Sequence, residues 1–354
     1  MELRDKNILV TGGAGFIGSH VCEHFTKMGC KVIAFDNLER GKILGKEINQ
    51  SYNLNFLKNL NNLEFIKKDI RDLKALKIVC KDVDIIIHTA AQVAVTTSLK
   101  DPNQDFEINA LGTFNVLEAA RQSANDPHLI YCSTNKVYGS NVNKIPVGKK
   151  GKRYEFEDEK FEKGVPEDFS IDLCEHTPYG SSKLAGDIYV QDYSHIYDLK
   201  TGVFRMSCIY GTRQFGVEDQ GWVAWFAIAT LLGKPITIYG DGSQVRDILY
   251  VDDLIKAYEL FIKSNLKQEV FNIGGGHKNT LSLLELLELL EEVTGKRTKI
   301  EYSDWRPSDQ KVYVSDIRKV RKKLGWEVKI SPKEGVSKMV EWLKANIELF
   351  KNNL

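Results

Sequence analysis

A tyrosine and a lysine four residues apart are the side chains in this sequence best suited to chemistry. Tyr179 and Lys183 lie in the helix-period segment PYGSSKLAGDIYVQDY, so both side chains are expected on one side of a helix. A free phenol has a pKa of about 10, and a neighbouring ammonium favours the ionised form. The pair can therefore supply a base that removes a proton from a hydroxyl group, although the YxxxK spacing alone is weak evidence.

Two hydroxyl side chains strengthen this interpretation. Ser133 and Thr134 end the apolar segment HLIYCST, and ligands of open α/β sheets bind beyond the carboxyl ends of the strands. Thr134 is therefore a candidate to position the reacting oxygen and to ease proton transfer. The alternative role for Thr134 is to satisfy backbone groups at the end of the strand.

A glycine-rich turn near the N-terminus predicts a phosphate-binding site. TGGAGFIG places Gly12, Gly15 and Gly18 after an apolar strand and at the opening of a helix, as in dinucleotide-binding folds. Glycine lets the backbone approach a pyrophosphate closely. The amides of Phe16 and Ile17 at the helix N-terminus then attract the anion.

An aspartate at the end of the second strand predicts which dinucleotide binds. Asp36 lies where a carboxylate accepts hydrogen bonds from the adenosine ribose and repels a ribose phosphate, so NAD is favoured over NADP; a turn or helix-capping role is the alternative. Asp69 follows the third strand and could meet the adenine or serve only in a turn. The expected cofactor-binding residues are Gly12, Gly15, Phe16, Ile17, Gly18, Asp36, Asn37, Asp69, Ile70, Ala90, Asn109, Ser133, Tyr179 and Lys183.

The elements that must position these residues alternate between strand and helix. NILVTG, KVIAFD, LEFIKKD, VDIIIHTA, HLIYCST and TGVFRMS read as strands. Consecutive apolar positions are typical of parallel strands that helices cover on both faces. The pattern predicts an α/β fold, a Rossmann doubly wound parallel sheet with a smaller mixed α/β C-terminal domain. The expected boundaries are 1–205 plus about 245–275 for NAD binding, and about 206–244 plus 276–354 for the substrate.

Two further segments carry structural signals. Ser282 and Glu285 form a capping-box pattern before a helix whose apolar face is Leu283, Leu286, Leu287, Leu290 and Val293. The charged stretch 148–164 interrupts the sheet pattern. It is expected to be a solvated surface insertion, with a mobile cover over the site as the alternative.

Composition excludes several classes of function. The 49 basic and 48 acidic residues nearly cancel, which disfavours nucleic acid and membrane surfaces as partners. Six cysteines without a CxxC pair fit reduced thiols better than a disulfide or zinc framework, so no metal is expected. No apolar run approaches the roughly 20 residues of a membrane helix, and the N-terminus lacks a signal-peptide core. A cytoplasmic location is therefore expected.

The motifs TGGAGFIG, HTAAQ, STNKVYG, PYGSSK and QVRD together resemble the extended short-chain dehydrogenases/reductases that modify nucleotide sugars, over essentially the whole chain. The resemblance implies an NAD-dependent isomerase that is a homo-oligomer, a dimer or a tetramer. It also implies that the fixed charges of Arg246 and Arg306 contact the substrate diphosphate. The expected substrate-binding residues are Gln92, Thr96, Thr134, Ser207, Arg213, Gln214, Gln244, Arg246, Arg306 and Asp309. Trp222 and Trp225 are candidates for lining the same pocket, and the alternative is a role in the core or in a subunit contact.

Departures from the family pattern narrow the expected reaction. Asn135 and Lys136 replace the Asp-Glu pair of nucleotide-sugar dehydratases, so a dehydratase is disfavoured. The string RMSCIYGTRQFGVEDQGWVAWF is similar to the branch that inverts C2 of a CDP-activated dideoxyhexose through a transient 2-keto intermediate, for O-antigen lipopolysaccharide synthesis. Cys208 stands where most relatives have asparagine, which suggests a differently held sugar.

Three hypotheses remain from the sequence. They are a C2 epimerase of a CDP-sugar, which is favoured, a C4 epimerase of a UDP-sugar, and a non-catalytic dinucleotide-binding protein. The intact set Thr134, Tyr179 and Lys183 argues against the third, which the fold alone would not exclude.

Overall fold

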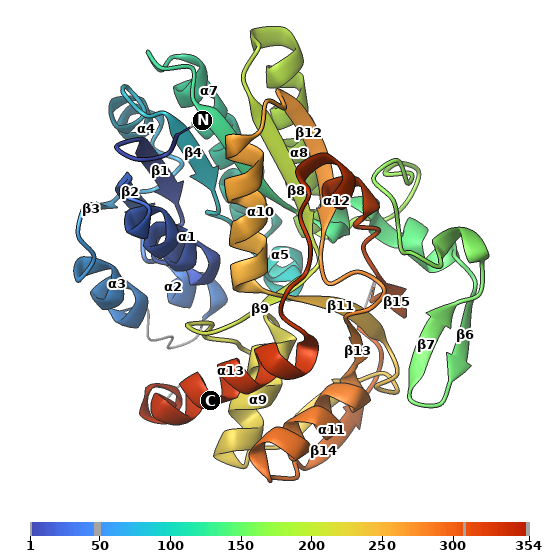
Figure 1. Ribbon diagram of the computed structural model, residues 1–354. Helices are drawn as coiled ribbons and strands as arrows, with labels where there is room; N and C mark the ends of the chain where they lie inside the picture. The colour runs from blue at the N-terminus through green and yellow to red at the C-terminus, as the bar shows by residue number, and fades with distance from the viewer. Residues whose placement is uncertain (1, 46–50, 307–308, 352–354) are drawn as a thin grey trace. The chain divides into compact units, whose positions relative to one another are not determined.

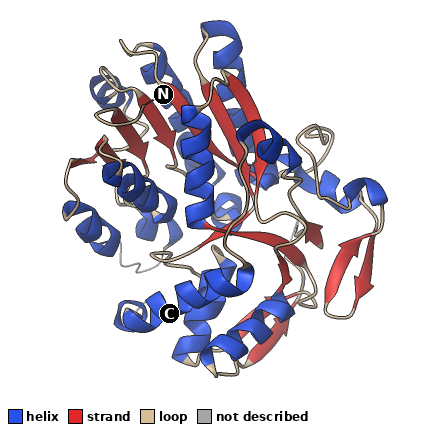
Figure 2. Ribbon diagram, in the orientation of Figure 1, coloured by secondary structure: helices blue, strands red, loops and turns tan. Residues whose placement is uncertain are grey.

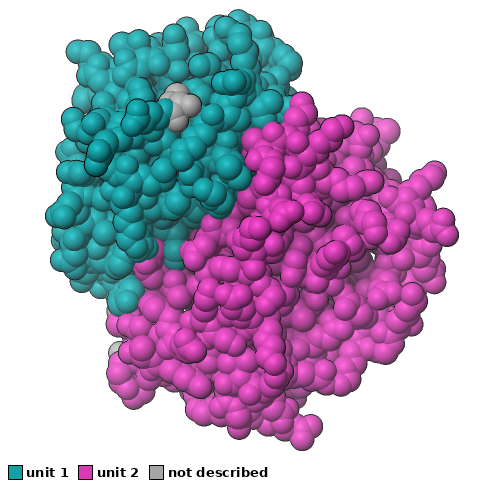
Figure 3. Space-filling model, viewed as in Figure 1, with its two compact units in different colours: residues 1–137, 177–205, 255–271 teal, residues 138–176, 206–254, 272–354 magenta. Residues whose placement is uncertain are grey.

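The computed structural model describes residues 2–45, 51–306 and 309–351. The chain forms two compact units, which Figure 3 shows in different colours. Unit 1 contains residues 1–137, 177–205 and 255–271, and unit 2 contains residues 138–176, 206–254 and 272–354. The expected boundaries differ from this division at 138–176, 245–254 and 272–275, which belong to unit 2. The reason is that a hairpin within 138–176 packs on the strand that begins at Val245.

A seven-stranded sheet organises unit 1, in the order β12-β8-β5-β4-β1-β2-β3. β1 pairs in parallel with both β2 and β4, and all six predicted strands are present (Figure 1). The strands are β1 (Asn7–Thr11), β2 (Lys31–Asp36), β3 (Leu63–Lys67), β4 (Ile85–His88), β5 (His128–Thr134), β8 (Thr201–Met206) and β12 (Gln268–Ile273). β4 and β5 are buried along their whole length because helices cover both faces of the sheet. The doubly wound parallel sheet is thus confirmed.

Helices complete unit 1 on both faces of the sheet (Figures 1 and 2). α1 packs on β1 and β2, while α7 and α8 pack on β4 and β5. The helices are α1 (Phe16–Lys27), α2 (Arg40–Leu44), α3 (Ser51–Lys58), α4 (Leu73–Val79), α5 (Val95–Lys100), α6 (Pro102–Phe106), the π-helical turn η1 (Glu107–Leu111), α7 (Gly112–Arg121), α8 (Thr177–Tyr197) and α10 (Val251–Lys263), whose end belongs to unit 1. Leu9, Ile86 and Leu129 lie in the core beneath α7 and α8.

Unit 2 is a mixed α/β structure built around β11, which pairs antiparallel with β13 and parallel with β9 and β15. β10 and β14 form a separate parallel pair. The elements are β9 (Cys208–Tyr210), α9 (Trp222–Leu232), β10 (Ile236–Tyr239), β11 (Val245–Tyr250), β13 (Thr280–Ser282), α11 (Leu283–Thr294), β14 (Ile300–Ser303), β15 (Val312–Tyr313), α12 (Arg318–Leu324), α13 (Pro332–Ala345) and the 3-10 turns η3 (Glu159–Phe161) and η4 (Ile347–Phe350); the turn η2 (Asn135–Lys144) bridges the division. The capping box of Ser282 and Glu285 is confirmed, and it starts α11.

The charged stretch 148–164 contains an antiparallel hairpin of β6 (Val147–Lys150) and β7 (Arg153–Phe156). Its apolar side chains Val147, Tyr154 and Phe156 pack on a cluster at β11 and β15 within unit 2, while its lysines are exposed. Tyr154 also donates from its backbone N–H to the carbonyl of Ser243 at 2.8 Å. The segment is therefore a surface insertion that is anchored to its own unit.

Within the described part of the chain, no helix is both long and apolar enough to span a membrane. The same residues contain no cluster of three or more His, Cys, Asp or Glu side chains that could hold a metal ion.

Candidate active site

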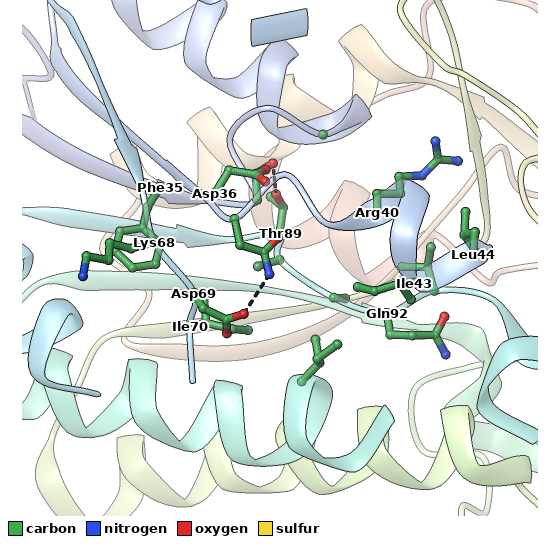
Figure 4. Close-up of a pocket in the computed structure, with 17 residues that line it drawn as sticks. Phe35, Asp36, Arg40, Ile43, Leu44, Lys68, Asp69, Ile70, Thr89 and Gln92 are labelled. Atoms are coloured by element: carbon green, nitrogen blue, oxygen red, sulfur yellow. Dashed lines mark hydrogen bonds between the residues drawn. The ribbon is translucent and has the colours of Figure 1, made fainter. Parts of the chain in front are cut away.

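A pocket opens in unit 1 at the carboxyl ends of the central strands (Figure 4). Seven of the predicted cofactor residues line it: Gly12, Gly15, Asp36, Asn37, Asp69, Ile70 and Ala90. Gln92, which the sequence assigned to the substrate, lines it as well. The pocket therefore lies where ligands bind in doubly wound folds.

The glycine turn leaves a space that larger residues would close. Gly12 has a φ of +69°, and a Cβ there would lie 2.7 Å from the backbone nitrogen of Ala90. A Cβ on Gly18 would lie 2.1 Å from the carbonyl oxygen of Gly12. This close approach sets α1, which begins at Phe16, directly behind the turn. The cradle fits a dinucleotide diphosphate, because backbone amides at a helix N-terminus bind phosphate oxygens.

Two carboxylates of the pocket are held by local hydrogen bonds. Asp36 accepts from the backbone N–H groups of Leu38 at 2.7 Å and Ala14 at 3.1 Å, and burial raises its pKa. Asp69 accepts from the Asn37 side chain at 2.8 Å (Figure 4) and from Arg71. Although burial raises the pKa of Asp69, the hydrogen bonds and charge of Arg71 bring it to about 2.

Arg40 is a pocket residue that the sequence analysis missed. It begins α2, and its side chain lines the pocket with Asp36 and Lys68 (Figure 4). Burial lowers the pKa of Arg40 to about 10, so the guanidinium still carries its charge at neutral pH. A basic residue in DNLERG, four positions after the acidic end of β2, is the signal that could have identified it.

Helix α8 carries Tyr179 and Lys183, as predicted. The helix begins at Thr177, whose hydroxyl accepts from the Gly180 N–H at 3.4 Å, and proline at the next position favours a helix start. The Tyr179 N–H donates to the Ser98 hydroxyl at 3.1 Å. The exposed fractions of Tyr179 and Lys183 are only 8% and 3%. Both groups therefore work in a poorly hydrated environment.

The surroundings of Tyr179 keep its phenol protonated. Burial raises the pKa of Tyr179 to about 12, the hydrogen bond with the Thr134 hydroxyl lowers it, and the negative charge of Asp105 raises it. The sequence predicted a phenol made acidic by Lys183, whereas burial has the largest effect on the pKa of Tyr179. An additional positive charge beside the phenol is needed for ionisation near neutral pH.

Lys183 contacts an aromatic ring of β5. Its Nζ atom is 4.2 Å from the centre of the Tyr131 ring. Burial lowers the pKa of Lys183 to about 8, while Cys132, Asp187 and Asp105 raise it. The ammonium form therefore persists at neutral pH.

Three predicted ligands belong to buried hydrogen-bond networks. Ser133 donates to Asp187 at 2.6 Å. Asn109 accepts from the Gln92 N–H and donates to the Gln92 carbonyl, both at 2.9 Å. The Gln92 side chain itself donates to Asp105 at 2.8 Å and to a backbone carbonyl. These hydrogen bonds hold the pocket wall in place. A sequence pattern does not distinguish a polar side chain with this role from one that binds a ligand.

The remaining predicted substrate residues, apart from half-buried Thr96 on α5, lie in unit 2. Arg246 forms an ion pair with Asp309 at 2.7 Å, and Ser207 donates to Asp247, the neighbour of Arg246, at 2.5 Å. The Arg306 guanidinium lies 3.9 Å from the centre of the Tyr239 ring.

Three buried polar residues of unit 2 complete the predicted set: Arg213, Gln214 and Gln244. Gln244 donates to the Tyr239 carbonyl at 2.7 Å, and Gln214 donates to a carbonyl of β9 at 3.3 Å. Within the described ranges, the side-chain oxygens of both glutamines have no hydrogen-bond partner, which leaves two acceptors for a ligand. Cys208 accepts a hydrogen bond from the Trp222 indole at 3.2 Å.

Known proteins are similar to this chain in architecture and in sequence. The chain is 42% identical to the CDP-paratose 2-epimerase of Salmonella typhi, over 95% of this chain and 98% of that one. The structure of a UDP-glucose 4-epimerase from Thermotoga maritima with UDP-glucose aligns with a TM-score of 0.80 and 32% identity, over 96% and 99% of the two chains. A UDP-glucuronic acid 4-epimerase from Bacillus cereus, in complex with UDP-glucuronic acid and NAD, aligns with a TM-score of 0.80 and 28% identity, over the same shares.

The family assignment rests on most of the chain. Residues 8–274 match a family described as the NAD dependent epimerase/dehydratase family, and the match includes the glycine turn, Thr134, Tyr179 and Lys183. The predicted cofactor, NAD, and the predicted epimerase class are confirmed. The chain belongs to the NAD dependent epimerase/dehydratase family.

Proposed function

We propose that the protein epimerises C2 of a CDP-activated 3,6-dideoxyhexose and converts CDP-paratose to CDP-tyvelose through a transient 2-ketosugar. The observation that carries the proposal is the buried set of Thr134, Tyr179 and Lys183, in a chain 42% identical to a CDP-paratose 2-epimerase. The absence of the acidic pair after Thr134, where Asn135 and Lys136 stand, disfavours elimination of water. That the product of this reaction is used in O-antigen lipopolysaccharide synthesis stays a prediction.

The residues of unit 1 have distinct roles in this proposal. Tyr179 takes the proton of the sugar hydroxyl and later returns it, and the Thr134 hydroxyl orients the same oxygen. The Lys183 ammonium favours the phenolate and holds the nicotinamide ribose. NAD supplies, when bound, the oxidation and re-reduction of the sugar carbon, together with a positive ring charge. Gly12, Gly15 and Asp36 at the pocket hold the cofactor.

Unit 2 provides groups suited to the nucleotide diphosphate. Arg246 and Arg306 have fixed positive charges, and the free acceptor oxygens of Gln214 and Gln244 suit hydroxyl donors. Because the 2-ketosugar must be reduced from its opposite face, binding should be concentrated on the nucleotide, so that the sugar can turn.

A C4 epimerase of a UDP-sugar is the second candidate, because both aligned solved relatives were determined with UDP-sugars. The deciding experiment incubates the purified protein with CDP-paratose and, separately, with UDP-glucose, and follows the C2 and C4 configurations by proton NMR. We expect inversion at C2 of the CDP-sugar alone. Inversion only at C4 of UDP-glucose would exclude the 2-epimerase assignment.

An apolar surface of unit 1 supports assembly into a homo-oligomer, and a cytoplasmic location stays a prediction. Large apolar side chains are 41–58% exposed on helices that pack against one another: Leu99 on α5, Phe106 on α6, Leu111 on η1 and Ile188 on α8. Exposed patches of this kind favour association. In light scattering coupled to size exclusion, Phe106→Asp should lower the molecular mass, whereas Ile78→Asp on α4, where Ile78 is 77% exposed, should not.

A further inference from the structure

A buried carboxylate lies next to the proposed catalytic pair. Asp105 is 1% exposed and belongs to α6, directly before the π-helical turn η1. It accepts hydrogen bonds from the hydroxyl of Ser182 at 2.5 Å, from the side-chain amide of Gln92 at 2.8 Å and from that of Asn109 at 3.1 Å. Ser182 is the residue that precedes Lys183 on α8.

All three donors to Asp105 are neutral, which distinguishes it from the other buried carboxylate of the region. Asp187 forms an ion pair with Arg205 at 3.0 Å and is also bonded to Ser133. Among the described residues, no cationic side chain lies within ion-pair distance of Asp105. A buried charge that is hydrogen-bonded but not paired needs a nearby opposite charge to remain ionised.

The cation that meets this need is Lys183. Burial raises the pKa of Asp105 and lowers that of Lys183, and the charge of each group opposes this shift in the other. The π-helical turn aids this arrangement, since it carries Asn109 so that one amide contacts Asp105, Ser182 and the Gln92 backbone. Such turns inside helices are frequent at functional sites.

We propose that Asp105 is a positioning residue of the active site, which holds Ser182 and, through its charge, keeps the Lys183 ammonium protonated beside Tyr179. This role rests on the proposed function, because the Lys183 ammonium that Asp105 supports is one of the groups that the proposed epimerase reaction uses. The hydrogen bonds fix the start of the helical turn that carries Lys183, and the charge fixes its protonation state. Asp105 acts through Lys183 and Tyr179.

Other groups also face Lys183, and Cys132 and Asp187 raise its pKa in the same direction as Asp105. Asp187, on α8 itself, forms an ion pair with Arg205 at 3.0 Å. Burial raises the pKa of the Cys132 thiol on β5 to about 11. Burial lowers the pKa of His88 on β4 to about 3, so its imidazole is neutral. Tyr131 on β5 contributes only the face of its ring.

The test is an NMR titration of the Lys183 side-chain nitrogen in the cofactor-free full chain, labelled with ¹⁵N-lysine and assigned with Lys183→Met. Asp105→Asn removes the charge with little change of volume. We expect the midpoint for Lys183 to fall by on the order of one pH unit. An unchanged midpoint in a folded Asp105→Asn variant would overturn the proposal.

Glu107→Gln provides a matched control. It removes one negative charge two positions along the chain, from a side chain that is 40% exposed, so water should screen the change. The Lys183 midpoint should stay at its native value in Glu107→Gln. In Asp105→Glu, which keeps the negative charge, the midpoint should lie closer to the native value than in Asp105→Asn. A fall in the Glu107→Gln variant as large as in Asp105→Asn would contradict a specific role of Asp105.

A second measurement does not need a folded Asp105 variant. Carboxyl ¹³C NMR of the native chain should show Asp105 ionised at pH 7, and a protonated carboxyl there would overturn the proposal. Neither measurement uses the sugar substrate, so both remain valid if no epimerisation is detected. In the active enzyme, Asp105→Asn should move the alkaline fall of kcat to lower pH with little change of KM for the nucleotide sugar.

Discussion

The ammonium of Lys183 lies 4.2 Å from the centre of the Tyr131 ring, and the Tyr131 hydroxyl donates to the Lys183 carbonyl at 3.2 Å. One aromatic residue of β5 thus contacts both the charge and the backbone of this lysine. The electron-rich ring face stabilises the cation, whereas the hydroxyl bond fixes the helix turn that carries it. The two contacts can be separated by substitution.

Replacing Tyr131 by leucine should move the alkaline limit of activity. Lys183 has a pKa of about 8, lowered from its usual value by burial, and its ammonium is lost as the pH rises through that value. Without the ring face, about 0.5–2 kcal/mol of stabilisation disappears, so the loss begins at lower pH. The pH profile of kcat measures this shift.

Tyr131→Phe is the matched variant, because it keeps the ring and removes only the hydroxyl. Its alkaline limit should equal that of the native enzyme, while the unfolding free energy falls by about 1 kcal/mol. Identical alkaline limits for the leucine and native proteins would show that the ring does not influence Lys183.

Tyr179→Phe should separate chemistry from cofactor binding. The substitution removes the hydroxyl and keeps the ring, so turnover should fall by about 10² to 10⁴, with the NAD content of the purified protein unchanged. Tyr197 lies at the end of the same helix and is 48% exposed, so Tyr197→Phe should retain full turnover. Normal turnover in Tyr179→Phe would remove the proposed base.

Local sequence patterns predicted the sheet and the glycine turn because both depend on neighbours along the chain. Runs such as Ile85–His88 are buried on both faces of the sheet, and the turn needs glycine wherever α1 approaches it. The same local character made the capping box of α11 predictable. Such patterns report an element and the face that it buries.

Contacts between distant parts of the chain could not be predicted in this way. Asp105 and Ser182 are 77 positions apart, and the sequence around neither residue indicates that the two side chains are hydrogen-bonded. Gln92, Asn109 and Ser133 have the side chains of ligands, but the fold uses their hydrogen bonds internally. Residue type therefore indicated polar groups near the site without showing which of them remain available.

Gly18→Ala should weaken NAD binding through the backbone. The added Cβ would lie 2.1 Å from the Gly12 carbonyl oxygen, so α1 or the turn must shift, at a cost of about 1–3 kcal/mol. Calorimetric titration with NAD should show the loss of affinity. Gly29→Ala is the control: its φ of +84° is strained for alanine, but its Cβ would come no closer than 3.5 Å to the Arg4 side chain. It should lose stability and keep its NAD affinity.

Arg40 should contribute its charge to cofactor binding. Its side chain lines the same pocket as Gly12 and Asp36, and a guanidinium that meets a diphosphate in a poorly hydrated place forms strong hydrogen bonds. Arg40→Met keeps much of the apolar stem, so the expected loss is about 1.5–3 kcal/mol, roughly a 10- to 150-fold weaker Kd for NAD.

Comparing two fragments of the cofactor identifies the cause of that loss. Adenosine lacks the diphosphate, so its affinity should change little in Arg40→Met, whereas ADP should lose affinity as NAD does. Arg121→Met, which removes an arginine paired with Glu118 on α7, should leave both affinities at their native values. Equal weakening of adenosine and ADP would mean that Arg40 only shapes the pocket wall, and the phosphate contact would then have to come from Lys68 or from the amides at the start of α1.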